Sequence, residues 1–189
     1  MPVTTLDPTT ALIVVDLQKG IVGRPLAHPV DGVIERTTAL LAAFRACGLP
    51  VVLVNVAGGP AGRTDQRDGA PRVRDLPEGW TDLIPELDAR ADDILVTKHA
   101  RSAFTGTGLA ERLRGLGATQ VVVTGIATSS GVESTARDAH ELGFNVTLPT
   151  DAMTDSGADR HEHSVARIFP RIAETGTARD VLDLLAARS

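Results

Sequence analysis

The chain has 189 residues, 42% of them apolar, and carries a formal net charge of −5 at pH 7. This length suits one domain, with two small domains as the alternative, and the apolar content is enough for a sizeable core. An acidic chain offers no basic surface to a polyanion, so neither nucleic acid nor an anionic membrane surface is expected as a partner.

The sequence lacks the patterns of a membrane or exported protein. No apolar run approaches the roughly 20 residues that span a bilayer, and no basic region followed by an apolar stretch opens the chain. We therefore expect a cytoplasmic protein. The single cysteine, Cys47, excludes an internal disulfide and a multi-cysteine metal site, and it stands in the last turn of a predicted helix, where it suits packing.

Apolar runs of strand length alternate with segments of helical periodicity along the whole chain. Strands are predicted at residues 11–16, 51–56, 94–97, 121–124, 144–148 and 171–173. Helices are predicted at residues 30–46, around 84–87, at 106–116, after residue 131, at 159–169, and at the end of the chain up to residue 188. This alternation predicts a three-layer, doubly wound α/β fold with a mainly parallel sheet of about six strands.

Two polar residues follow the first apolar run. Asp16 closes the run, either as the cap of a following turn or as a carboxylate presented at the edge of the sheet. Gln18 lies two residues further on. It either orients that carboxylate or a substrate, or it is a solvated loop residue.

Residues 57–79 form a long segment with five glycines, three prolines and no apolar period, which predicts a loop that is either mobile or functional. None of the histidines lies in it, and the spacing of the five histidines in the chain does not match a metal site. We expect neither a metal nor another cofactor.

The segment Val121–Ala139, with the sequence VVVTGIATSSGVESTARDA, combines a strand, a turn of small residues and the start of a helix. In an open α/β sheet such a junction lies at the carboxyl edge, where the amino ends of helices present N–H groups to ligands. We therefore expect a binding or catalytic site here.

Three segments together resemble the isochorismatase-like hydrolases, the superfamily of isochorismatases, nicotinamidases and N-carbamoylsarcosine amidases. They are IVVDLQ at residues 13–18, TKHARSAF at 97–104 and TGIATSSGVESTARDA at 124–139. The resemblance covers nearly the whole chain. It implies a hydrolase of a small-molecule substrate, a strand order of 3-2-1-4-5-6, and a homodimer or higher homo-oligomer.

The resemblance also assigns roles to single residues. Asp16 matches the general acid/base of the family, Lys98 matches its catalytic lysine, and Gly131 stands where the cysteine hydrolases have their nucleophile. Judged without the resemblance, a lone lysine after a strand is an ordinary solvated residue. Arg101 and Phe104 continue the lysine motif, and Phe104 is either the wall of an apolar pocket or a core residue.

Candidate substrate-binding residues also follow the fourth predicted strand: Ile126, Ala127, Thr128, Ser129 and Ser130. The resemblance implies a cis peptide bond between Ile126 and Ala127. A serine at 129 or 130 could replace the missing thiol as nucleophile, although both positions are displaced from that of the cysteine. The alternative role of these serines is to cap the helix.

Gly131 has no side chain and cannot form a covalent intermediate, which disfavours the thiol-dependent amidase route. Isochorismatases can also have glycine at this position; there the aspartic acid protonates the alkene carbon of a vinyl ether and water traps the oxocarbenium ion. We predict a hydrolase that uses Asp16 and Lys98 for acid-base chemistry without a cysteine. The alternatives are an amidase that cleaves C–N bonds and a catalytically inactive binding protein.

Overall fold

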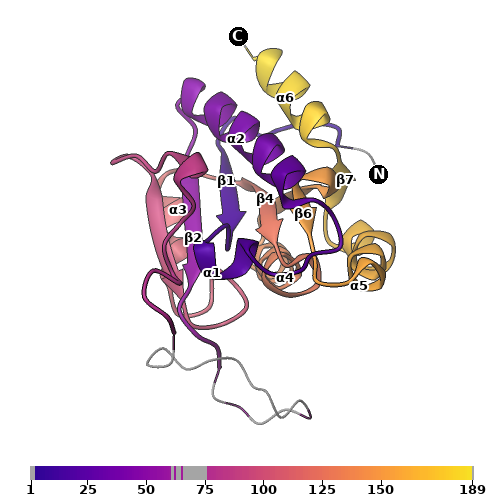
Figure 1. Ribbon diagram of the computed structural model, residues 1–189. Coiled ribbons are helices and arrows are strands. Elements are labelled where there is room, and N and C mark those ends of the chain that lie inside the picture. The colour runs from indigo at the N-terminus through magenta and orange to yellow at the C-terminus, as the bar shows by residue number, and fades with distance from the viewer. Residues whose placement is uncertain (1–2, 61, 63–64, 66–75, 189) are drawn as a thin grey trace.

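The computed structural model describes residues 3–60, 62, 65 and 76–188, and within them the strands form one sheet in the order β3-β2-β1-β4-β5-β7, with β6 paired to β4 (Figure 1). The strands are β1 (Thr10–Val15), β2 (Val51–Val56), β3 (Ile94–Lys98), β4 (Gln120–Ile126), β5 (Asn145–Pro149), β6 (Met153–Thr154) and β7 (Glu174–Gly176). All ladders between these strands are parallel. The predicted α/β fold with a mainly parallel sheet is confirmed.

The helices are α1 (Lys19–Val22), α2 (Val30–Ala46), α3 (Leu109–Gly115), α4 (Glu133–Glu141), α5 (Ala158–His163) and α6 (Ala178–Ala186). Short helical turns lie at Pro85–Leu87, Thr128–Val132, Thr150–Ala152, Ser164–Ile168 and Phe169–Arg171.

Successive residues of β1 face opposite layers of helices, as expected for a strand buried on both faces. Leu12 and Val14 pack in one hydrophobic cluster with residues of α2 and α6. Ile13 and Val15 pack in the other cluster with residues of α3 and α4. The molecule is therefore a three-layer structure, and Figure 1 shows α2 and α6 side by side on one face.

The structure differs from the sequence-based expectation mainly near the end of the chain. The predicted helix at 159–169 ends as a regular helix at His163 and continues through two irregular turns, in which Pro170 supplies no N–H group. The last strand is Glu174–Gly176 rather than residues 171–173, because Arg171 still belongs to a helical turn. The helix predicted at 106–116 begins only at Leu109, after Gly108 in a left-handed conformation.

Much of the long segment predicted at 57–79 lies outside the described residues. Among the residues that the structure does describe, no helix is both long enough and apolar enough to cross a membrane.

Candidate active site

The candidate site lies at the carboxyl edge of the sheet, where β1, β3 and β4 end. Asp16 follows β1 directly and has a φ of 54°, so the chain turns sharply at this residue. Lys98 is the last residue of β3, and Gly131 lies in the turn between β4 and α4. Three segments that are far apart in sequence thus reach one edge of the sheet, at the point where ligands of open α/β folds bind.

Asp16 and Lys98 form a buried ion pair. The Lys98 Nζ donates to Asp16 Oδ2 at 2.8 Å, and the two residues are only 6% and 2% exposed. Because β2 lies between β1 and β3, the lysine side chain must reach across the end of that strand, where Val56 pairs with Lys98. The Lys98 ammonium group therefore points at the Asp16 carboxylate and not into solvent.

The surroundings of Asp16 favour proton exchange near neutral pH. Burial raises the pKa of Asp16 to about 6, and the adjacent Lys98 limits the rise because its charge favours the carboxylate. Asp16 Oδ1 is buried and has no hydrogen-bond partner among the described residues. One carboxyl oxygen is thus held by the lysine, and the other is unpaired among the described residues.

Gly131 lies directly beside this carboxyl group. A Cβ built on Gly131 would be 3.2 Å from Asp16 Oδ2, 2.9 Å from Val15 Cγ1 and 3.4 Å from the Ile126 carbonyl oxygen. A side chain at position 131 would therefore contact the acid. Glycine leaves that space free, but it supplies no nucleophile.

Gln18 is not the solvated loop residue considered above, and its role in orienting a substrate stays a prediction. Its side chain is buried and donates to the carbonyl oxygens of Val56 and Trp80, at 3.1 and 3.0 Å. Its Oε1 accepts the Val56 N–H at 2.7 Å. Gln18 therefore ties the end of β2 to the segment around Trp80; it is not solvated, and these bonds go to backbone groups rather than to Asp16.

The two residues that continue the lysine motif lie in different environments. Phe104 is buried and stacks on Phe144, with ring centroids 5.9 Å apart. Of the two roles considered for it, pocket wall and core residue, the structure shows the core residue. Arg101 is exposed.

The turn after β4 begins with a cis peptide bond between Ile126 and Ala127, as predicted. Thr128 is buried, and its Oγ1 lies 2.9 Å from His161 Nδ1 on α5. The Ser129 N–H and hydroxyl both donate to Asp155 Oδ2, at 2.7 and 2.8 Å. Ser130 is half-buried, and its N–H donates to the Ala127 carbonyl oxygen at 3.1 Å.

Asp155 is a poor base for Ser129. Burial on its own raises the pKa of Asp155, but hydrogen bonds from Ser129 and Ser156 outweigh it and hold that pKa below the ordinary value. A serine nucleophile needs a partner that readily accepts its proton. The Ser129 hydroxyl is therefore better described as a donor that ties the turn to Asp155.

Sequence reasoning missed Asp155 and the contact of His161 with Thr128, since 26 and 33 residues separate each of them from its partner. Among the described residues, no three His, Cys, Asp or Glu side chains are grouped so as to hold a metal ion.

The doubly wound α/β sheet places this protein among the open α/β proteins that bind ligands at the carboxyl edge of the sheet, and its buried Asp–Lys pair lies at that edge. An isochorismatase domain model matches residues 10–180. The chain is 42% identical over 183 residues to YecD of Escherichia coli O157:H7, an uncharacterized isochorismatase family protein, with 94% of this chain and 96% of YecD covered.

Two further relatives agree with this match. Maleamate amidohydrolase of Pseudomonas putida is 30% identical over 183 residues, covering 93% of this chain and 86% of the relative. The structure of an isochorismatase family protein from Burkholderia thailandensis has a TM-score of 0.89 and 39% identity, covering 96% of this chain and 98% of that one. The chain belongs to the isochorismatase family of hydrolases.

Proposed function

We propose that this chain hydrolyses a small molecule by acid-base chemistry at Asp16, with water and not an enzyme side chain as the nucleophile. The observation that carries the proposal is the state of the Asp16 carboxyl group, which is buried, has a pKa of about 6, and has one oxygen without a hydrogen-bond partner among the described residues. A carboxyl group of this kind both gives and accepts protons at neutral pH.

Lys98 has two functions in this proposal. Its Nζ fixes Asp16 Oδ2, which leaves Oδ1 as the oxygen that transfers the proton. Its positive charge also keeps the pKa of Asp16 from rising further, so that the carboxylate is regenerated after each proton transfer.

The reaction that suits a protonated Asp16 is hydrolysis of a vinyl ether. The acid transfers its proton to the alkene carbon, which produces an oxocarbenium ion, and water adds to the electron-poor carbon. The Asp16 carboxylate takes the proton released by that water, and the hemiketal breaks down to a carbonyl compound and an alcohol. No bond to the enzyme forms, so glycine at position 131 suffices.

The second candidate is hydrolysis of an amide C–N bond. It is favoured by the 30% identity to maleamate amidohydrolase. Here the ionised Asp16 removes a proton from water as the water attacks the carbonyl carbon, and then returns the proton to the leaving nitrogen. This route needs the carboxylate at the start of the reaction, whereas the vinyl-ether route needs the acid.

The pH dependence of kcat/KM distinguishes the two reactions. If Asp16 acts as an acid, kcat/KM falls about tenfold per pH unit above pH 6; if it acts as a base, kcat/KM falls in the same way below pH 6. Lys98→Met removes the charge that limits the pKa of Asp16, so the inflection should move to higher pH in either case. The measurement is a steady-state pH profile on a panel of vinyl ethers, amides and carbamates.

Asp16→Asn should lower kcat by about 100-fold or more, because an amide cannot exchange the proton. Asp88→Asn, at an exposed site, is the matched control and should leave turnover unchanged. Iodoacetamide should also leave turnover unchanged, because Cys47 is exposed at the end of α2, whereas Asp16 lies at the opposite, carboxyl edge of the sheet. Turnover that survives Asp16→Asn but not alkylation, or no turnover of any compound in the panel, would contradict the proposal.

A further inference from the structure

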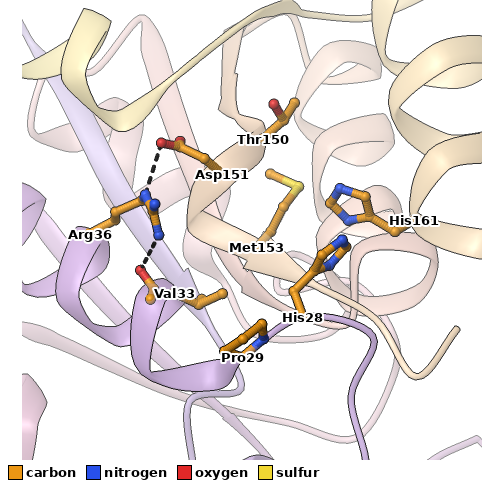
Figure 2. Close-up of a pocket in the computed structure, with 9 residues that line it drawn as sticks. His28, Pro29, Val33, Arg36, Thr150, Asp151, Met153 and His161 are labelled. Atoms are coloured by element: carbon orange, nitrogen blue, oxygen red, sulfur yellow. Dashed lines mark hydrogen bonds and ion pairs between the residues drawn. The ribbon is translucent and has the colours of Figure 1, made fainter. Parts of the chain in front are cut away.

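A cavity of about 520 Å³ lies on the other side of β4 from the Asp16 site, next to β6. It is bordered by the start of α2, by residues around β6 and by α5, and none of the residues proposed for acid-base chemistry lines it. Its volume is typical of pockets that hold small organic ligands. Figure 2 shows His28 and His161 on one side of the cavity and Arg36 on the other, with Met153 between them.

The two histidines are held in fixed orientations and are in contact with each other. Their ring centroids lie 4.7 Å apart, and the interplanar angle is 64°. His28 Nδ1 lies 3.1 Å from Thr154 Oγ1, and His161 Nδ1 lies 2.9 Å from Thr128 Oγ1. Both rings therefore have Nδ1 engaged, and neither Nε2 has a hydrogen-bond partner among the described residues.

The threonine beside His28 can hold this ring with Nε2 as a donor. Thr154 Oγ1 accepts the His28 backbone N–H at 3.2 Å, and its hydroxyl proton is available to His28 Nδ1. When the hydroxyl donates to Nδ1, the Nε2 of His28 carries a proton and is a donor. Burial lowers the pKa of His161, with His28 acting in the same direction, which keeps this ring neutral at pH 7.

Arg36 supplies further donors on the opposite side. Its Nε pairs with Asp151 Oδ2 at 3.0 Å, and its Nη1 donates to the Gly32 carbonyl oxygen at 2.7 Å. The other oxygen of Asp151 accepts the Ala178 N–H at 2.7 Å, so both carboxylate oxygens already have partners. The Arg36 Nη2 group has no hydrogen-bond partner among the described residues and is left as a free donor of the lining.

The cavity thus has hydrogen-bond donors at two ends and apolar side chains between them, from Pro29, Val33 and Met153. We propose that it is a second ligand site, for a small dicarboxylate whose two charged ends bind the histidine pair and Arg36. The hydrocarbon chain between the carboxylates packs on the apolar residues. Such a ligand matches the placement of donors at two ends of the cavity, since each carboxylate accepts several hydrogen bonds.

The test is a titration of the full chain with succinate, glutarate and adipate, followed by NMR of the histidine ring signals and by calorimetry. At least one of the three should bind saturably and shift the His28 and His161 signals. The monocarboxylate of the same chain length should bind about tenfold more weakly, because one end loses its partner. Saturable binding by none of the three overturns the proposal.

Variants locate the binding. Arg36→Gln and His161→Phe should each weaken the dicarboxylate by about tenfold, and Arg36 is exposed enough to be replaced without loss of the fold. His140→Phe, on the exposed side of α4, is the matched control and should bind as the parent does. Binding should also persist in Asp16→Asn, which separates this site from the proposed reaction. If binding is lost in Asp16→Asn but unchanged in Arg36→Gln, the dicarboxylate occupies the Asp16 site and the proposal is wrong.

Discussion

Gly131 determines how much room lies beside the Asp16 carboxyl group. A Cβ at this position would lie 2.9 Å from Val15 Cγ1, which is closer than two carbon atoms approach without a shift. Val15 is completely buried between the sheet and α4, so its side chain has little freedom to move away. The space next to the acid is therefore small, and its size is set by one side chain of β1.

The first prediction is that Gly131→Ala lowers the free energy of unfolding by about 1–3 kcal/mol through overpacking against Val15. Val15→Ala removes the methyl group that the new Cβ would meet. The double variant should therefore lose less stability than the sum of the two single variants, by about 0.5–1 kcal/mol or more. Urea unfolding of the four proteins measures this difference. Strict additivity would show that the two positions do not compete for space.

At the scale of elements, the turn at Thr128–Val132 is held by the chain that follows β6 and by α5. Asp155 accepts hydrogen bonds from Ser129 and from the Ser156 N–H, the latter at 2.7 Å. The hydroxyl of Ser164, just after α5, donates to Glu133 Oε2 at 2.7 Å. The turn that carries Gly131 thus depends on side chains that come later in the sequence.

Asp155→Ala should lower the free energy of unfolding by about 2–4 kcal/mol at pH 7, because several hydrogen bonds to a buried charge are lost. The folded-state pKa of Asp155 lies below its ordinary value of 3.8, so its contribution is complete above that value and is lost as the pH falls through the folded-state pKa. The difference between parent and variant should therefore shrink below about pH 4.

Thermal unfolding between pH 3 and pH 7 measures the effect of Asp155→Ala. Asp183→Ala, on the exposed face of α6, is the control and should change the stability by only a few tenths of a kcal/mol. A difference between Asp155→Ala and the parent that grows toward acid would mean that the carboxylate does not stabilise the turn.

At the scale of the whole molecule, we propose the edge of the sheet at β3 as the surface that associates with a second copy of the chain. β3 is the last strand in the sheet order on that side, and Leu95, its second residue, is 60% exposed. Leu116 and Leu142 are the other large apolar residues that are exposed among the described ones. Edge strands that present apolar side chains are sites of association.

We expect the chain to form a homodimer or a larger homo-oligomer at micromolar concentration. Sedimentation velocity should then give a species of at least twice the 19.8 kDa mass of the chain. Leu95→Lys should shift the equilibrium toward monomer if β3 takes part, whereas Leu116→Lys, at the end of α3, serves as the comparison. A monomeric parent protein at these concentrations would contradict the expectation.

The sequence by itself determined the order of the longer strands and helices, whereas the short elements α1 and β6 were not predicted. Helix α2 and strand β2 were predicted with the bounds that the structure gives them, Val30–Ala46 and Val51–Val56. Both signals are local, because the apolar period of a segment reports which of its faces are buried. The motifs also pointed to Asp16, Lys98 and Gly131, whose catalytic roles stay predictions.

Only the tertiary structure decided what each side chain contacts. It placed Phe104 in the core, joined Gln18 to Val56 and Trp80, and brought His28 against His161 on one side of a cavity. It also set the pKa of Asp16, since that value depends on burial and on a lysine 82 residues away in the chain. Periodicity shows that a residue is buried, but the partners of a polar group are fixed by distances between segments, which exist only once the sheet has formed.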